Sequence, residues 1–203
     1  MHLNRPKRFD VLVIGCGIAG TMAAISAARA GARTAIACLG PLFSGSSFYP
    51  GTWGLGLIGP ESPSDEADLA DCILDVGCGM ADPALVASFV GGISDGLAQL
   101  EALGMTLKKP ARAQEREFIP CFDRKHRLWR GIERGPFEHA MAAELDRLNV
   151  TVLPRQELID LAMQEGTATG AVLFDHAAQS FELVPAGAVV LATGGYGGLF
   201  ERR

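Results

Sequence analysis

The sequence predicts an α/β fold in which a parallel sheet is combined with a small antiparallel β-meander. A strand, a helix and a second strand follow one another near the start of the chain, and a glycine motif joins the first two. Four short strand-like segments then lie within residues 150–184, separated by turn residues. A last apolar run, "AGAVVLATGG", is typical of a buried strand that rejoins a parallel sheet.

Length and composition bound the class of protein. The 203 residues suffice for one sizeable domain or two small ones, and 48% hydrophobic and 20% charged residues describe an ordinary globular chain. A net charge of -5 argues against a nucleic-acid partner, and the cytoplasm is the default compartment. The cysteines lack C-x-x-C spacing, so we expect buried free thiols and no disulfide framework or metal site. They are Cys16, Cys38, Cys72, Cys78 and Cys121.

The first predicted unit is a Rossmann-like βαβ segment. The run from Phe9 to Ile14 is apolar and β-branched, as in a strand that is buried on both faces. Half of residues 19–30 are alanine, which favours a closely packed helix, and Gly31 can end it. The segment "ARTAIAC" at residues 32–38 then returns as the second strand.

The turn between the first strand and the helix reads G-x-G-x-x-G, with Gly15, Gly17 and Gly20 at the glycine positions. The first glycine permits a tight turn, the second lets the backbone approach a pyrophosphate, and the third lets the helix pack closely. Free N–H groups and the positive dipole end of the helix attract the phosphates. The motif alone is weak, but the flanking strand, helix and strand are the context that it requires.

A targeting segment is the competing interpretation of the same stretch. Arg5, Lys7 and Arg8 precede an apolar run that ends in a possible lipid-attachment cysteine, Cys16. Only seven residues separate Arg8 from Cys16 and one of them is Asp10, whereas a secretory core needs about 7 to 15 uninterrupted apolar residues. We therefore expect neither a signal peptide nor a membrane span.

The middle of the chain predicts a long functional loop followed by two helices. Residues 39–65 are rich in Gly, Pro and Ser, and Ser64 or Asp65 can cap a helix that runs to about Val76. Asp82 and the proline after it read as the start of a second helix, which Gly104 closes. On this helix, the apolar stripe that we expect to face the protein core consists of Leu85, Phe89, Leu97, Leu100 and Leu103.

Residues 108–134 are basic and irregular, which predicts a solvated surface, with an anion-facing role as the minority alternative. A helix should begin at Gly135 and end near Asn149, with His139 in a structural role. The meander strands are then expected at residues 150–153, 158–163, 170–174 and 180–184.

The order of these pieces resembles the amino-terminal part of the flavoproteins related to succinate dehydrogenase, fumarate reductase and L-aspartate oxidase. The segments that carry the resemblance are "DVLVIGCGIAGTMAA", "GPLFSGSSFYPGTWG", "TVLPRQELIDLA" and "AVVLATGG". Within them, "LGPLFSGSSFY" is most similar to the L-aspartate oxidase version. The resemblance covers almost the whole chain and is loose only at residues 108–134.

The resemblance implies that the cofactor is FAD. It places the pyrophosphate at the glycine turn, and a serine-rich loop that contains residues 44–47 beside the phosphates and the flavin ring. It also places the meander at the adenine and the last strand over the cofactor. The residues so assigned are Gly15, Gly17, Ala19, Gly20, Cys38, Ser44, Gly45, Ser46, Ser47, Leu158, Ala192, Thr193 and Gly194.

Three departures from the family pattern qualify this assignment. Many members end the second strand with an acid that binds ribose, whereas Cys38 is a poor acceptor. Members with covalently attached flavin use a histidine in the serine-rich loop. This loop has no histidine, so we expect noncovalent FAD. The histidines of the chain are His2, His126, His139 and His176. Thr52 and Trp53 stand where the family has paired glycines.

The family's substrate-binding and proton-transfer residues lie beyond the point matched by Arg203, in a capping domain and in the second half of the FAD domain. We therefore expect an incomplete fold, one FAD-binding domain over residues 1–203 with a flexible lead at residues 1–8, and no catalytic residue to assign. Small-molecule substrate would bind only with the missing domain, and a partner subunit or homo-oligomer could cover exposed apolar faces.

Two functions follow from the resemblance. The first is the FAD-binding portion of an oxidoreductase that transfers hydride to or from a small acid such as a dicarboxylate or amino acid. The alternative is a truncated or split nucleotide-binding subunit without activity of its own. A nicotinamide-binding Rossmann domain is a third possibility, disfavoured because the meander and "ATGG" have no place in its alternation of strands and helices.

Overall fold

The computed structural model describes residues 8–48, 55–107, 127 and 129–195. The chain divides into two compact units. The sheet unit comprises residues 1–52 and 141–203, and the helical unit comprises residues 53–140. The expected flexible lead falls almost entirely at residues 1–7, outside the described residues.

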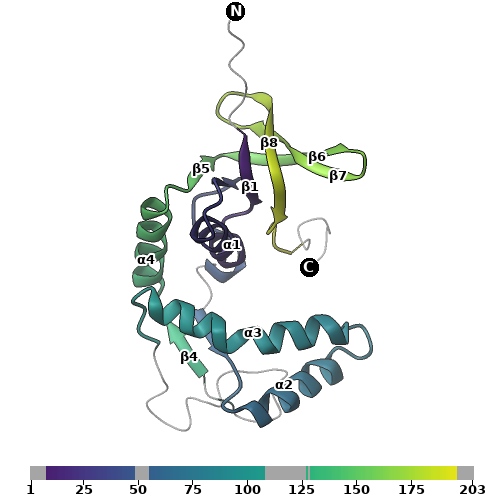
Figure 1. Cartoon of the computed structure of the whole chain (residues 1–203). Helices are drawn as coiled ribbons and strands as arrows, with labels where there is room; N and C mark the ends of the chain where they lie inside the picture. The colour runs from purple at the N-terminus through teal and green to yellow at the C-terminus, as the bar shows by residue number, and fades with distance from the viewer. Residues whose placement is uncertain (1–7, 49–54, 108–126, 128, 196–203) are drawn as a thin grey trace, which may run out of the picture. The chain divides into compact units, whose positions relative to one another are not determined.

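The sheet unit is built on six strands in the order β5-β2-β1-β8-β7-β6 (Figure 1). Strands β5, β2, β1 and β8 run parallel, whereas β8, β7 and β6 are antiparallel. This arrangement confirms the predicted α/β class with a parallel sheet and an antiparallel portion. The strand bounds are β1 Phe9–Ile14, β2 Thr34–Cys38, β5 Thr151–Pro154, β6 Gln156–Gln164, β7 Thr167–Asp175 and β8 Ser180–Leu191.

The predicted four-stranded meander was wrong in two respects. The segment expected at residues 150–153 does not join it, because β5 pairs with β2 in the parallel sheet, with Ala35 opposite Thr151. The segment at residues 180–184 and the last apolar run form one strand, β8, which pairs first with β7 and then with β1. Pro185 lies within this strand opposite Gly170, where a Cβ would come within 2.3 Å of the Val184 carbonyl oxygen.

Helix α1 (Ile18–Arg29) packs on β1 and β2, as the alanine-rich sequence predicts. Its buried face includes Ala24 and Ile25, and both are fully inaccessible to solvent. Gly31, at φ +88°, follows the last turn and ends the helix. The core of the sheet on either side of β1 consists of Phe9, Leu12, Ile14, Ala35, Ala37, Ala171, Leu173, Val184 and Ala186.

Helix α4 (Arg134–Arg147) reaches the sheet unit with its last two turns. There Glu144 accepts hydrogen bonds from Arg147 at 2.7 Å and Arg29 at 2.9 Å. These two guanidinium groups, that of Arg147 above all, lower the pKa of Glu144 to about 2. The ion pair therefore ties α4 to α1 within the sheet unit.

Replacing Glu144 by Gln should lower the free energy of unfolding at neutral pH, and this loss should vanish in acid. The carboxylate has a folded pKa of about 2 against an ordinary value of 4.5, so it stabilises the fold above pH 4.5. That contribution is lost as the pH falls from 4.5 towards 2. Urea denaturation of both proteins over this range measures the difference.

The matched control is Glu138→Gln, which breaks an exposed pair with Arg134 on the same helix and should change stability little. If Glu144→Gln lowered the free energy of unfolding by the same amount down to pH 2, the effect would not come from the charge of Glu144.

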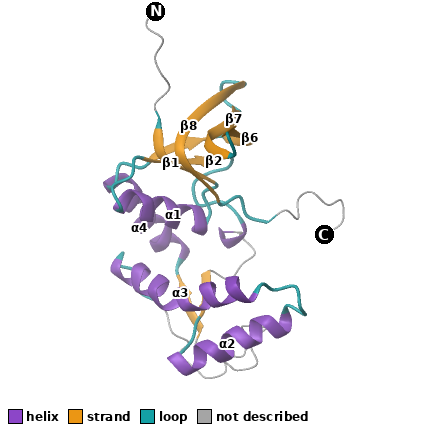
Figure 2. Ribbon diagram, turned by 45° about the vertical axis from the view of Figure 1, so that its right-hand side comes forward, coloured by secondary structure: helices purple, strands orange, loops and turns teal. Residues whose placement is uncertain are grey.

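The helical unit contains two helices that run beside each other (Figure 2). They are α2 (Pro63–Val76) and α3 (Pro83–Ala102). Asp82 caps α3 as predicted, with its carboxylate accepting the Ala84 N–H at 2.8 Å. The predicted cap of α2 was wrong, because Ser62 precedes the proline at the first helical position and accepts the Asp65 N–H at 3.3 Å.

The expected core stripe of α3 was wrong in its first half. Leu85 and Phe89 are 70% and 64% exposed, whereas Val86 and Val90 are buried against Leu69 of α2. In the second half Leu100 is buried as expected. The sequence offered two adjacent apolar rows, and the position of α2 decides which of them is covered.

The helical unit also contains a two-stranded antiparallel sheet that was not predicted. Strand β3 (Leu55–Ile58) lies within the segment expected to be a long loop, and β4 (Trp129–Ile132) lies within the basic segment. They pair with Leu55 opposite Ile132. Most of the basic segment, residues 108–126 and 128, lies outside the described residues.

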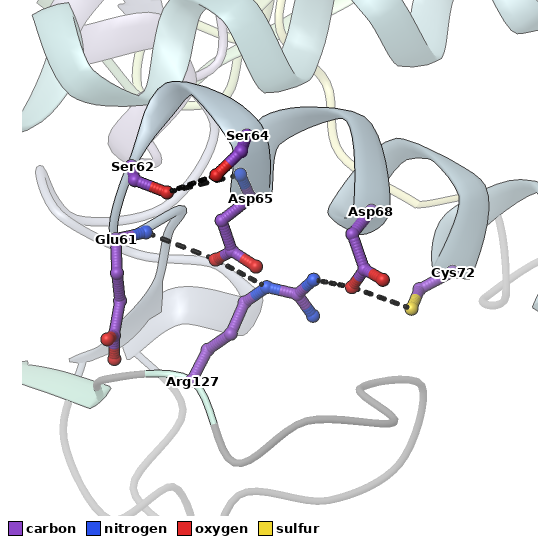
Figure 3. A network of polar contacts seen from close by, with 7 residues as sticks. All are labelled: Glu61, Ser62, Ser64, Asp65, Asp68, Cys72 and Arg127. Carbon is purple, nitrogen blue, oxygen red and sulfur yellow. Dashed lines mark hydrogen bonds and ion pairs between the residues drawn. The ribbon is translucent and has the colours of Figure 1, made fainter.

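The predicted solvated basic surface is wrong at Arg127. Its side chain is 1% exposed, and it bridges two carboxylates on the first turns of α2 (Figure 3). The Nε atom donates to Asp65 at 3.0 Å, and an Nη atom donates to Asp68. Asp65 also accepts the backbone N–H of Glu61 at 3.1 Å. A buried cation is thus held by two acids instead of by water.

Candidate functional site

A cleft of about 450 Å³ opens at the carboxyl ends of the parallel strands in the sheet unit. Four segments form its walls: the turn after β1 with the start of α1, the residues after β2, the serine-rich loop, and the end of β8. Carboxyl ends of strands in open α/β sheets are the usual place for a ligand. The lining residues are Gly15, Cys16, Gly17, Ile18, Ala19, Leu39, Gly40, Ser44, Gly45, Ser46, Leu191, Ala192, Thr193 and Gly194.

The three motif glycines have different surroundings. Gly15 adopts φ +104°, and a Cβ there would lie 2.3 Å from the Ala192 carbonyl oxygen. A Cβ on Gly20 would lie 1.9 Å from the carbonyl oxygen of Gly15, so this glycine lets α1 pack on the turn. At Gly17 the nearest atom would be the Ser44 carbonyl oxygen at 3.5 Å, which is ordinary contact distance. The protein itself therefore leaves room beside Gly17.

The start of α1 is available to an anion. Gly17 is its N-cap residue, no side chain of the described residues caps it, and its first turn carries no acid. Helices α2 and α3 differ, since Ser62 caps α2 and Asp82 caps α3. The uncapped N–H groups and the positive dipole end of α1 thus face the cleft, as binding of a pyrophosphate requires.

The serine-rich loop is fastened to the glycine turn. The Phe43 N–H donates to the Cys16 carbonyl oxygen at 3.2 Å, and the Ser44 hydroxyl lies 3.7 Å from the Cys16 sulfur. Phe43 is buried, and its ring packs on that of Phe48 with centroids 5.8 Å apart. These contacts hold the Ser44 hydroxyl at the rim of the cleft.

Two buried thiols lie at the end of β2 and in the turn after β1. Cys16 and Cys38 are 4% and 1% exposed, and the Cys38 thiol stabilises the ionised form of the Cys16 side chain. That interaction, with hydrogen bonds from Ser44, lowers the pKa of Cys16 to about 6. The same interaction and burial raise the pKa of Cys38.

The structure brings most of the sequence-assigned residues to this cleft. Those that line it are Gly15, Gly17, Ala19, Ser44, Gly45, Ser46, Ala192, Thr193 and Gly194. Gly20 lies behind the turn, the Cys38 thiol contacts Cys16 instead of the cleft, and Leu158 packs on the sheet core. The Ser47 side chain and residues 52 and 53 lie outside what the structure describes.

Sequence reasoning missed five lining residues: Cys16, Ile18, Leu39, Gly40 and Leu191. Cys16 and Ile18 occupy the variable positions of the glycine motif, so the motif itself could have indicated them. Leu39, 57% exposed, takes the place in the wall that Cys38 was expected to hold.

A protein-family model described as FAD binding domain matches residues 10–203. The chain belongs to this FAD-binding domain family. The match confirms the predicted resemblance and identifies FAD as the cofactor for which this fold is built.

Two curated relatives match nearly the whole of this chain. L-aspartate oxidase of Halobacterium salinarum is 35% identical over 205 residues, which cover 95% of this chain and 39% of the relative. Vinyl phenol reductase of Lactiplantibacillus plantarum is 24% identical, over 97% of this chain and 40% of the relative. The chain thus spans about two fifths of the length of the curated relatives it matches.

Solved structures show the same fold. The open conformation of a flavocytochrome c3 fumarate reductase superposes with a TM-score of 0.76 at 22% identity, over 96% of this chain and 35% of that one. A quinol fumarate reductase of E. coli gives a TM-score of 0.76 at 20% identity, over 96% and 34%. At this identity the likeness concerns the fold.

The residues of the cleft fit the pyrophosphate of FAD. Gly17 leaves an open position beside the backbone, and the uncapped start of α1 supplies N–H groups at the same place. Within the described ranges, no group of three or more metal-ligating side chains comes together. None of the helices in those ranges is long and apolar enough to cross a membrane.

Proposed function

We propose that the chain is the FAD-binding portion of a flavin-dependent oxidoreductase that transfers hydride to or from a small acid, such as a dicarboxylate or an amino acid. The open position beside Gly17 at the uncapped end of α1 carries this proposal, because it is shaped for a pyrophosphate. The likeness to L-aspartate oxidase supports the class of reaction. When bound, the flavin supplies the hydride chemistry and the protein positions it.

Each wall of the cleft has a separate role in this proposal. Gly15, Gly17 and Ala19 offer backbone to the pyrophosphate, and Gly20 acts indirectly by seating α1 on the turn. The serine-rich loop donates hydrogen bonds to the phosphates through Ser44, with Gly45 and Ser46 beside it. The end of β8 closes the cofactor site through Ala192, Thr193 and Gly194.

The assigned residues outside the cleft keep weaker roles. Leu158 would offer only backbone to the adenine from strand β6, and Ser47 would add to the serine-rich loop. Cys38 would act through Cys16, because its thiol is buried beneath the turn. We propose that FAD is held noncovalently, since the serine-rich loop has no histidine.

Both units belong, in this proposal, to one FAD-binding domain that acts together with further protein, either in the same chain or in a partner subunit. Phe181 and Leu183 of β8 are 68% and 51% exposed, and such apolar surface is commonly covered by other protein. The small-molecule substrate would bind in that combined assembly, and the cytoplasm is the compartment we expect.

Titration of FAD into the purified chain tests the proposed function. We expect the visible flavin band to remain with the protein after gel filtration, and FMN, which lacks the pyrophosphate and the adenosine, should be lost. Acid precipitation should then release all the flavin into the supernatant if attachment is noncovalent. If circular dichroism shows that the chain is folded and it retains neither FAD nor FMN, the proposal is contradicted and a role without FAD is favoured.

A further inference from the structure

Cys16 and Cys38 lie at the carboxyl ends of neighbouring parallel strands, where Cys16 lines the cleft. Cys16 lies between Gly15 and Gly17 in the turn after β1, and Cys38 is the last residue of β2. The strands remain paired up to this point, because the Gly15 N–H donates to the Ala37 carbonyl oxygen at 2.9 Å. The register pairs Ile14 with Ala37, so Cys16 is offset from Cys38 by one position along the strands. With about 4.8 Å between strands and about 3.3 Å per residue, this offset leaves the two backbones within the range that a disulfide spans.

The two thiols differ in access and in chemistry. Cys16 lines the cleft, whereas Cys38 is 1% exposed and reaches only Cys16 and its buried surroundings. The Cys16 thiol donates to the Pro41 carbonyl oxygen at 3.3 Å and lies beside the Ser44 hydroxyl. Its lowered pKa favours the thiolate, which is the form that peroxides oxidise. Cys16 is thus suited to react first and Cys38 to react second.

We propose that Cys16 and Cys38 form a peroxide-sensitive thiol pair, and that their disulfide and bound FAD exclude each other. The Cys16 thiolate attacks hydrogen peroxide, which with one proton leaves a sulfenic acid and water. The Cys38 thiol then condenses with the sulfenic acid, and the disulfide forms as a second water leaves. Two electrons pass from the thiols to the peroxide, and no other reactant is needed.

The exclusion follows from the place of Cys16 in the turn, and this part rests on the proposed function. A disulfide draws the two sulfurs to about 2.05 Å, well inside their contact distance, and so pulls Cys16 towards β2. It also removes the thiol that hydrogen-bonds the Pro41 carbonyl oxygen, next to the serine-rich loop. Conversely, a pyrophosphate on the glycine turn would cover the cleft that Cys16 lines.

Peptide mapping of the 203-residue chain after treatment with hydrogen peroxide tests this pair. Trypsin with a glutamate-specific protease separates Cys16, in residues 9–29, from Cys38, in residues 34–61, while Cys72 and Cys78 share residues 67–101. We expect the first two peptides to be joined, with a loss of about 2 Da for the two hydrogens. The variants Cys16→Ser and Cys38→Ser should each lack this link.

The same assay with FAD tests the exclusion. At an FAD concentration 100 times its dissociation constant, linking should slow about 100-fold, because about 1% of the protein is free. Alkylation of the exposed Cys78 should not change, and this serves as the internal control. Oxidised protein should retain at most about a tenth of the flavin that reduced protein retains, and reduction with a dithiol should restore FAD binding.

The outcomes separate this inference from the proposed function. Absence of the link in folded, FAD-free protein would overturn the thiol pair. Linking at an unchanged rate in protein that visibly retains flavin would overturn the exclusion. A chain that forms the link but never binds FAD would overturn the exclusion and the proposed function, and would leave the thiol pair established.

Discussion

Adding one methyl group at Gly17 should weaken FAD binding by about 100-fold or more while the chain remains folded. A Cβ at this position meets no protein atom closer than 3.5 Å, and the backbone at φ -72° and ψ -173° suits alanine. The same methyl would occupy the space that the pyrophosphate needs beside the backbone. A 100-fold loss corresponds to about 2.8 kcal/mol of binding free energy. Flavin fluorescence titration of Gly17→Ala measures it.

Two further glycine variants separate binding from folding. Gly17→Ala should cost about 1 kcal/mol of stability or less, as alanine is a poorer N-cap than glycine. Gly20→Ala should destabilise the fold by about 1 to 3 kcal/mol, because its Cβ would lie 1.9 Å from the Gly15 carbonyl oxygen. Gly91→Ala, on an open face of α3, should be neutral or stabilising. Unchanged FAD affinity in Gly17→Ala would refute the assignment of the turn.

Replacing Arg127 by Met should destabilise the chain by about 3 to 5 kcal/mol. The guanidinium is 1% exposed and donates to the carboxylates of Asp65 and Asp68, and Asp65 is itself buried (Figure 3). Removing the cation leaves a buried carboxylate without its charged partner, which costs far more than the loss of a surface pair. Urea denaturation followed by far-ultraviolet circular dichroism gives the change in unfolding free energy.

The matched control is Arg134→Met, since Arg134 forms an exposed pair with Glu138 and should matter by less than about 1 kcal/mol. Adding Asp65→Asn to Arg127→Met should recover part of the loss, because the buried charge is then removed. Equal effects of Arg127→Met and Arg134→Met would show that the buried network contributes no more than a surface contact.

Local sequence predicted those elements whose signals lie within a few residues. The bounds of β1 were predicted, and those of α1 and β2 to within two residues, because β-branched, alanine and glycine residues act through the backbone. The start of α3 followed from Asp82 for the same reason. The glycine motif likewise indicated the place of the cleft, since a tight turn and a close approach each require glycine.

Pairing between distant segments was predicted less well. Strand β5 was assigned to the meander, yet it pairs with β2, more than a hundred residues earlier in the chain. The exposed row of Leu85 and Phe89 was assigned to the core, and Arg127 to the surface. Each of these outcomes depends on which other segment arrives at the same place, and no local pattern contains that information.

The sequence by itself determined the βαβ unit, the glycine turn and the resemblance to FAD-binding flavoproteins, because each rests on backbone requirements of neighbouring residues. Only the tertiary structure decided that Leu39 replaces Cys38 in the wall of the cleft, and that Cys38 lies against Cys16. The alternation of side chains across a strand is set locally, but which face is covered depends on the packing of distant segments. The position of the cleft and most of its lining were therefore predictable, whereas the part of the wall that follows β2 became known only from the fold.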